Sequence, residues 1–178
     1  MRVIGGRSRG RRLAAKLPKS VRPTSDRVRE SIFDIIGSQG GVEGLAVVDL
    51  FCGSGALGVE ALSRGAASAI FVDHDPDALA AVRQNLHAVG LDDASATLVR
   101  ASLPGWLHSG AVPNFDLALC DPPYDFAEWP ELVGALRADV AVLESAAAVP
   151  LPEGWMVARE RRYGGTLVTV AQRSGGGS

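Results

Sequence analysis

Short apolar runs alternate with amphipathic stretches along most of this chain of 178 residues. Five runs have the length and composition of buried β-strands: 45–50, 69–72, 96–99, 115–120 and 140–143. Three stretches between them carry apolar residues at helical spacing: 56–63, 76–89 and 127–137. A short helical turn is expected around Trp106 and Leu107. This alternation predicts parallel strands in one sheet with helices on its faces.

The two ends of the chain differ from this pattern. Gly164-Gly165 separates 155–163 from 166–172, which is typical of a β-hairpin and adds an antiparallel strand. The segments 2–4 and 11–14 predict a β-hairpin or extended arm, and a helix is expected from the capping residues Thr24-Ser25-Asp26 to Ile36. We therefore expect an α/β fold with a doubly wound, Rossmann-like, mostly parallel sheet. The predicted division is a basic N-terminal extension at 1–36, a main domain at 45–173 and a tail at 174–178.

Composition limits the classes of protein that remain. The chain is 47% hydrophobic and 21% charged, as expected of a globular protein with one substantial core. No apolar run approaches the roughly 20 residues that span a bilayer, so no membrane association is expected. Cys52 and Cys120 are the only cysteines, which favours a reducing cytoplasm over a disulfide framework. No Cys/His spacing indicates a metal site, and nothing in the sequence requires more than a monomer.

Charge is unevenly distributed. Residues 1–29 hold ten Lys and Arg residues and one acid, whereas the rest of the chain is acidic. This distribution favours contact between the N-terminal segment and nucleic acid; a solvated, flexible arm is the alternative. The candidate RNA-contacting residues are Arg7, Arg9, Arg11, Arg12, Lys16, Arg22, Thr24, Arg27 and Arg29.

Polar residues and a glycine turn follow the predicted strands. They are Asp49, Gly53, Asp73, Ser102 and Asp121. Because the carboxyl ends of parallel strands meet at one edge of the sheet, these residues are expected to converge on one crevice.

The turn after the first strand has the spacing of a nucleotide-binding loop. Gly53-Ser-Gly-Ala-Leu-Gly58 matches GxGxxG, and Asp73 lies twenty residues after Gly53, so a dinucleotide such as NAD is one interpretation. Two features oppose it. Asp49 would face the pyrophosphate and repel it. NAD chemistry also has no use for Asp121-Pro-Pro-Tyr124.

That tetrapeptide is the more specific signal. A residue before proline is held extended, so the backbone is stiff, and the Asp121 carboxylate and the Pro122 carbonyl can both point into the crevice. Two fixed acceptors suit an exocyclic amino group, which has two donors. Tyr124 can stack on the plane of a base. The alternative is a structural turn with a tyrosine packed on the core.

Together these motifs resemble those of class I S-adenosylmethionine-dependent amino-methyltransferases. Four further segments of the N-terminal block are similar to the RsmD-type family, the bacterial 16S rRNA (guanine(966)-N2)-methyltransferases: Arg2-Val-Ile-Gly-Gly6, Arg9-Gly-Arg11, Arg22-Pro-Thr24 and Asp26-Arg-Val-Arg-Glu30. The resemblance extends to about residue 172. It implies S-adenosylmethionine as cofactor and 16S ribosomal RNA as substrate. We expect this RNA to be within an assembling small subunit, and naked RNA stays open as the alternative.

The resemblance also implies roles for individual residues. Asp121, Pro122 and Tyr124 would form the catalytic group. The cofactor would contact Asp49, Phe51, Cys52, Gly53, Ser54, Gly55, Asp73, His74 and Ser102. In particular, Asp73 would bind the ribose hydroxyls and Asp49 would lie near the ammonium. Ser102 departs from the Asp or Asn that relatives often have there.

Three alternatives stay open on the sequence alone. Adenine-N6 methylation of DNA or RNA uses the same kind of acceptor pair. Methylation of a glutamine amide in a protein also does, but it gives the basic arm no role. A noncatalytic RNA-binding module with an unused pocket is the third.

Overall fold

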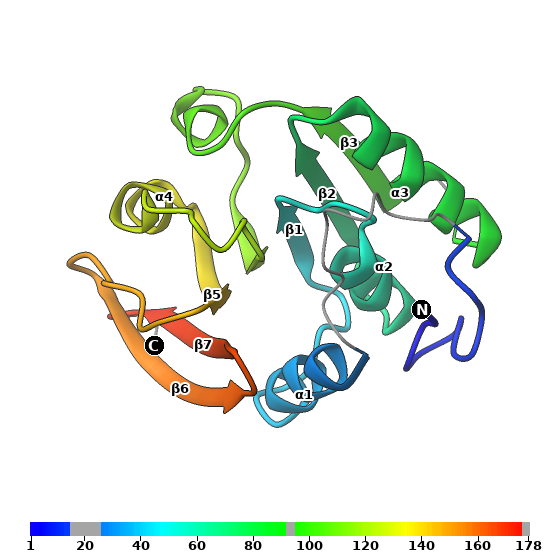
Figure 1. Cartoon of the computed structure of the whole chain (residues 1–178), viewed down its shortest axis with the longest axis horizontal. Helices are drawn as coiled ribbons and strands as arrows, with labels where there is room; N and C mark the ends of the chain where they lie inside the picture. Colours follow the sequence, from blue (N-terminus) through cyan, green and yellow to red (C-terminus); the bar gives the residue numbers. More distant parts are fainter. Residues whose placement is uncertain (15–25, 92–94, 176–178) are drawn as a thin grey trace.

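The computed structural model describes residues 1–14, 26–91 and 95–175, and Figure 1 shows the whole arrangement. Lys16, Arg22 and Thr24, and with them the expected helix cap at 24–25, lie outside the described residues.

The strands form one seven-stranded sheet in the order β3-β2-β1-β4-β5-β7-β6. Their bounds are β1 (Ala46–Leu50), β2 (Ser68–Asp73), β3 (Ala96–Arg100), β4 (Phe115–Cys120), β5 (Ala138–Ser145), β6 (Trp155–Tyr163) and β7 (Thr166–Arg173). The first five pair in parallel, whereas β7 is antiparallel to β5 and to β6. The expected mostly parallel sheet with a C-terminal hairpin is confirmed.

The strand order reverses at β1. From β1 the chain adds β2 and β3 on one side, and then returns to place β4 and β5 on the other. In sheets of this kind a ligand crevice opens at the carboxyl ends of the strands, where the order reverses. The crevice is therefore expected between the ends of β1 and β4.

The helices are α1 (Asp26–Gly37), α2 (Ala56–Ser63), α3 (Pro76–Ala88) and α4 (Trp129–Ala135), with a 3-10 turn, η2, at Gly105–His108. Two apolar clusters show which face each covers. One contains buried side chains of α1, α2 and α3, such as Ile32, Leu62 and Leu86, and the other contains Leu107 of η2 and Leu132 of α4. Helices thus cover both faces of the sheet (Figure 1).

The fourth helix and the fifth strand differ from the sequence prediction. α4 is shorter than the expected 127–137, because Pro130 is confined to its first turn and Leu136 is already extended, with ψ 131°. β5 is longer than 140–143, because it pairs with β4 on one side and β7 on the other.

The N-terminal arm, residues 1–14, is a hairpin with little regular structure. Its two halves form one antiparallel bridge, between Arg2 and Arg12, in place of the two short strands expected. Serine side chains attach the hairpin to the helical layer: the Ser63 hydroxyl donates to the Gly5 carbonyl at 2.6 Å, and the Ser8 hydroxyl donates to the Val89 carbonyl at 2.8 Å. The arm therefore lies against the carboxyl ends of α2 and α3.

A buried carboxylate holds the arm in place. Glu60, in the middle of α2, is 0% exposed and accepts hydrogen bonds from the backbone N–H groups of Ile4 at 2.8 Å and Gly5 at 2.7 Å. The same carboxylate accepts from Arg64 Nε at 2.8 Å and lies 3.7 Å from Arg29 Nε. One side chain thus joins α2, α1 and the arm.

Removal of this carboxylate is expected to destabilise the whole chain. Glu60→Ala should lower the free energy of unfolding by about 3–5 kcal/mol, because the fully buried Arg29 loses its buried partner and keeps only the exposed Asp26, and two backbone donors lose their acceptor. Urea unfolding measures the change. Glu43→Ala, at an exposed position, is the matched control and should stay within about 0.5 kcal/mol of the unaltered chain. Equal effects of the two substitutions would contradict this role of Glu60.

Candidate active site

The turn from β1 to α2 has an unusual backbone. Gly53 and Gly55 have φ of 51° and 73°, and Phe51, which is not a glycine, has φ of 57°. Such positive values are uncommon outside glycine and are concentrated at binding and active sites. The Asn85 amide donates to the Ser54 carbonyl at 2.9 Å and so supports the turn from α3. Sequence periodicity gave no sign of Asn85, because it lies on the apolar side of a helix.

The three glycines of the turn serve different purposes. A Cβ at Gly58 would lie 2.3 Å from Cε1 of Phe71, and one at Gly55 would lie 2.9 Å from Cγ2 of Val82, so both allow close packing of α2. A Cβ at Gly53 would meet no atom within 4 Å. Gly53 is therefore the one of the three with free space beside it, as a ligand-facing position requires.

Asp49 joins the strand to the helix. Its carboxylate is 1% exposed and accepts a hydrogen bond from Gly58 N–H at 2.8 Å. Burial raises the pKa of Asp49 well above its ordinary value; the Gly58 hydrogen bond lowers it, and the charges of Asp121 and Asp73 raise it further. Asp73, at the end of β2, and Asp121, directly after β4, are thus close enough to affect Asp49.

Asp73 links β2 to the same turn. Its two carboxylate oxygens accept from the backbone N–H groups of Gly53 and Asp75, both at 3.0 Å. His74 follows it, with Nδ1 3.4 Å from an Asp73 oxygen and 77% of its side chain exposed. The twenty-residue spacing between Gly53 and Asp73 therefore corresponds to a direct contact, and the carboxylate lies at the rim of the crevice.

A cavity of about 440 Å³ opens at this edge of the sheet. Four of the expected residues line it: Phe51, Asp73, His74 and Ser102. Its other wall comes from the segment after β4. Pro123 belongs to the Asp121-Pro-Pro-Tyr124 motif, whereas the sequence did not indicate the other four residues of this wall: Asp125, Phe126, Ala127 and Glu128. Volumes of roughly 300–1,000 Å³ are typical of small-molecule sites.

An aromatic contact connects the two walls. The Phe51 and Phe126 rings pack edge to face with centroids 5.1 Å apart, and Phe126 meets Trp129 of α4 in the same way at 5.3 Å. The two walls of the cavity are therefore in direct contact through aromatic rings. In the sequence, the sign of this cluster is the presence of Phe126 and Trp129 within five positions of Tyr124.

Asp121-Pro-Pro-Tyr124 lies where it was expected, directly after β4 and beside β1. Asp121 is half-buried, Pro122 is buried and the Tyr124 side chain is 60% exposed. The Tyr124 hydroxyl lies 3.4 Å from the Thr166 hydroxyl, at the start of β7. An exposed aromatic ring is thus present next to a partly accessible carboxylate.

Cys52 and Cys120 also lie near these acids, and both are free and buried. Burial raises the pKa of each thiol, and so does the charge of Asp49. Both thiols therefore stay protonated near neutral pH, which makes them weak nucleophiles.

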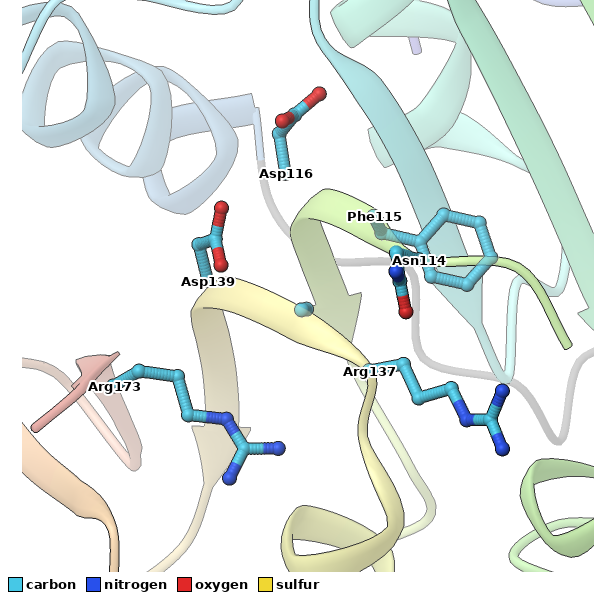
Figure 2. A pocket seen from close by; sticks show the side chains of 7 residues that line it. Asn114, Phe115, Asp116, Arg137, Asp139 and Arg173 are labelled. Carbon is cyan, nitrogen blue, oxygen red and sulfur yellow. The ribbon is translucent and has the colours of Figure 1, made fainter. Parts of the chain in front are cut away.

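A second hollow, of about 510 Å³, lies at the other end of the strands. Figure 2 shows Arg137 and Arg173 on one side of it and Asp116 and Asp139 on the other. Several of these groups bind the backbone: Asp116 accepts from Ala46 N–H at 2.7 Å, and Arg137 donates to the Val112 carbonyl at 3.2 Å. Because ligands of such sheets bind at the carboxyl ends of the strands, the cavity beside Asp73 is the candidate site.

The predicted RNA-contacting residues are in different situations. Arg7, Arg9, Arg11 and Arg12 of the arm and Arg27 of α1 are exposed. Arg29 is 0% exposed, and its Nη2 donates to Asp26 at 3.0 Å and to the Arg2 carbonyl. The prediction that Arg29 contacts RNA is therefore wrong: it lies on the inner face of α1, beside Glu60.

Two negative findings apply to the described residues alone. No helix at 1–14, 26–91 or 95–175 is long and apolar enough to cross a membrane. Within the same ranges, no three His, Cys, Asp or Glu side chains are grouped so that they could hold a metal ion.

Comparison with known proteins defines the class and then the family. The fold is that of class I methyltransferases: a solved structure of the Escherichia coli protein yhhF superposes with a TM-score of 0.83, at 31% identity, over 97% of both chains. The model of the family described as "Conserved hypothetical protein 95" matches residues 1–172. The chain belongs to this family, the RsmD-type family that its sequence resembles.

Two curated relatives cover almost the whole chain. The YlbH protein of Bacillus subtilis is 37% identical over 98% of this chain and 100% of its own length. Ribosomal RNA small subunit methyltransferase D of Escherichia coli K12 is 31% identical over 99% of this chain and 92% of its own length.

The burial of Asp49 predicts a pH dependence of stability. Because the folded pKa is raised, the folded chain holds this proton more tightly than the unfolded chain does. Its contribution to stability is therefore lost as pH rises from the unfolded value of about 3.9 toward the folded pKa. As pH rises across that range, the free energy of unfolding of the unaltered chain should fall relative to that of Asp49→Asn.

Urea unfolding at a series of pH values from about 4 upward, without added ligand, measures this difference. Asp139→Asn, at an exposed position, is the control and should follow the unaltered chain. A difference between Asp49→Asn and the unaltered chain that does not vary with pH would contradict the prediction.

Proposed function

We propose that this protein transfers a methyl group from S-adenosylmethionine to the exocyclic N2 of a guanine in 16S ribosomal RNA, at a position of the 966 type. Its substrate would be the RNA within an assembling small subunit, and its compartment the cytoplasm. The relative of the same family in Escherichia coli is named a ribosomal RNA small subunit methyltransferase. We further propose that the chain acts as a monomer.

One observation carries the proposal. β4 pairs with β1, so the Asp121-Pro122 pair comes next to the glycine turn, and the segment that follows it lines the same cavity as Asp73. A group that can orient an amine is therefore adjacent to a site that can hold a small ligand. If the site bound only a dinucleotide, the Asp121-Pro122 pair would have no role.

The residues of the crevice fit the proposed cofactor. Asp73 is at the rim, where its oxygens can accept from ribose hydroxyls, and the open side of Gly53 allows close approach of a ligand. A cationic group of the ligand beside the buried Asp49 would favour the ionised form of that carboxyl. We assign His74, Phe51 and Ser102 to the adenine end, since they line the same cavity. The remaining contacts are assigned to the backbone of Cys52, Ser54 and Gly55.

When bound, S-adenosylmethionine supplies an electrophilic methyl group on a sulfonium. The chain must then orient a weak nucleophile, because the guanine N2 lone pair is delocalised into the ring. The Asp121 carboxylate and the Pro122 carbonyl would accept the two N–H donors and aim the lone pair at the methyl group. Tyr124, exposed beside them, would stack on the base. Positioning and electrostatics of this kind supply most of the rate acceleration.

The methylated amine must lose one proton after the carbon–nitrogen bond forms. Asp121 is half-buried and therefore in contact with solvent, so the proton can pass to its carboxylate or to water. The guanine has to be unstacked to reach this position, at a cost of a few kcal/mol. We propose that the exposed arginines of residues 1–36 hold the surrounding RNA by phosphate contacts, whereas residues 45–173 carry out the chemistry.

Adenine-N6 methylation is the second candidate, because the same acceptor pair would suit the adenine amino group. Identification of the modified nucleoside distinguishes it from guanine-N2 methylation. Undermethylated small-subunit RNA, allowed to react with labelled cofactor and digested, should yield N2-methylguanosine by mass mapping. Methylated adenosine would overturn the base assignment, and tight binding of NAD without S-adenosylmethionine would overturn the class.

In the same assay, Asp121→Ala should lower kcat by about 10²- to 10³-fold, because one of the two acceptors that orient the amine is lost. Its affinity for S-adenosylmethionine, measured by calorimetry, should stay within about twofold. Asp139→Ala, an exposed aspartate at the other end of the sheet, is the control and should retain full activity. Near-normal transfer by Asp121→Ala would rule out the catalytic assignment.

The arm gives a separate prediction. Arg9→Ala combined with Arg11→Ala should weaken RNA binding and reduce the slope of log K against log salt by about 1–2, because two phosphate contacts are lost. Affinity for S-adenosylmethionine should not change. Arg137→Ala, exposed on the connection before β5, is the control. An unchanged salt slope in the double variant would remove the arm from the RNA interface.

A further inference from the structure

The edge strand β6 carries a concentration of positive charge that neither the sequence motifs nor the site explains. Arg159, Arg161 and Arg162 are all exposed. Among the strands that the structure describes, β6 pairs with β7 alone, and its other edge faces outward (Figure 1). This strand is outside the N-terminal extension, to which the candidate RNA contacts were assigned.

The carboxyl end of β6 reaches the candidate active site. β6 and β5 are both antiparallel to β7, so they run in the same direction and end at the same edge of the sheet. At that end Tyr163 pairs with Thr166, and the Thr166 hydroxyl is 3.4 Å from the Tyr124 hydroxyl. At about 3.3 Å per residue, Arg161 lies roughly 7 Å and Arg159 roughly 13 Å along the strand from this contact.

The charges of Arg159 and Arg161 are not neutralised within the described part of the chain. No Asp or Glu oxygen of residues 1–14, 26–91 or 95–175 is within 4.0 Å of a nitrogen of either arginine. The acid between them, Glu160, accepts a hydrogen bond from the Thr169 hydroxyl at 3.1 Å. Arg162 differs, because its Nη1 donates to the Ala146 carbonyl at 3.2 Å. Residues 159 and 161 lie on one face of the strand, two apart.

The crevice itself repels phosphate. Asp73, Asp125 and Glu128 line the cavity, and the charges of Asp121 and Asp73 both act on the buried Asp49. An RNA strand that places a base there needs positive charge beside the crevice to hold its phosphates. The described part of the N-terminal arm lies against the carboxyl ends of α2 and α3, away from Tyr124. The end of β6 is the basic surface next to that ring.

We propose that Arg159 and Arg161 bind the phosphates of the RNA strand that flanks the target guanine, and that the β6–β7 hairpin forms a second RNA contact surface beside Tyr124. The inference rests on the proposed function, since it assumes that the base entering the crevice belongs to RNA. It assigns the arm and β6 to different parts of one RNA substrate. Charged side chains on an edge strand also prevent edge-to-edge association, and this simpler role has to be distinguished by experiment.

The test uses the full chain and undermethylated small-subunit ribosomal RNA. Arg159→Ala combined with Arg161→Ala should raise KM for RNA about tenfold or more and lower the magnitude of the salt slope by about 1–2. Arg159→Lys combined with Arg161→Lys keeps both charges and should retain most of the slope. Arg83→Ala, exposed on α3 at the other side of the sheet, is the control and should leave KM and the slope unchanged.

Two further measurements separate the possible outcomes. Affinity for S-adenosylmethionine and the sedimentation profile of the alanine variant should match those of the unaltered chain. An unchanged KM and salt slope would overturn the proposal, and aggregation of the alanine variant with normal RNA binding by its monomer would assign the arginines to edge protection alone. Failure of the proposed function would show separately, as absence of methyl transfer by the unaltered chain.

Discussion

The fixed position of α2 is the constraint on which both the crevice and the arm depend. At its first turn Gly58 N–H is held by the buried Asp49 carboxylate, which sets the helix against β1 and leaves the glycine turn open on one side. Two residues later the buried Glu60 carboxylate accepts hydrogen bonds from the backbone of the arm and forms ion pairs with two arginines. A helix of eight residues, about 12 Å long, therefore joins the small-molecule site to the basic extension.

Three carboxylates at the ends of β1, β2 and β4 give the crevice its chemical character. Asp49 is buried, and Asp73 and Asp121 lie close enough for their charges to raise its pKa. Such an arrangement is unfavourable for an anionic ligand and favourable for a cationic one, because a positive charge would relieve both the burial and the mutual repulsion. A sulfonium and an ammonium suit this crevice, whereas a pyrophosphate does not. The acidic crevice also supports the proposal that RNA phosphates are held outside it.

Much of this structure could be predicted from local sequence. The alternation of short apolar runs with helical spacing is sufficient for the sheet, because the runs at β1 and β4 are almost wholly buried and most of the connections carry a glycine or a proline. The convergence of Asp49, Asp73 and Asp121 followed from the geometry of parallel strands. Their specific contacts, such as Asp73 with Gly53 N–H, agree with the spacing of the motif.

The sequence predictions were wrong or incomplete where contacts between distant elements determine the position of a side chain. Arg29 was interpreted as a surface residue because it is charged, yet it lies three and four positions before Ile32 and Phe33 and so on the apolar face of α1. Its burial depends on Glu60, thirty-one residues further along the chain, which no local pattern connects to it. Phe126 and Asn85 were missed for a similar reason: each acts through a partner from another element, Phe51 in one case and Ser54 in the other.

The positions of the two basic surfaces constrain the size of the proposed substrate. The arm lies over the helices that cover β1 to β3, and β6 is at the opposite edge of a seven-stranded sheet. Six strand spacings of about 4.8 Å separate the edges by roughly 29 Å. A duplex rises by at most about 3.4 Å per base pair, so a short stem of five or six pairs could not reach from one edge to the other. If both hold phosphates, the substrate has to be an RNA that is extended, or folded, so that it contacts both surfaces at once.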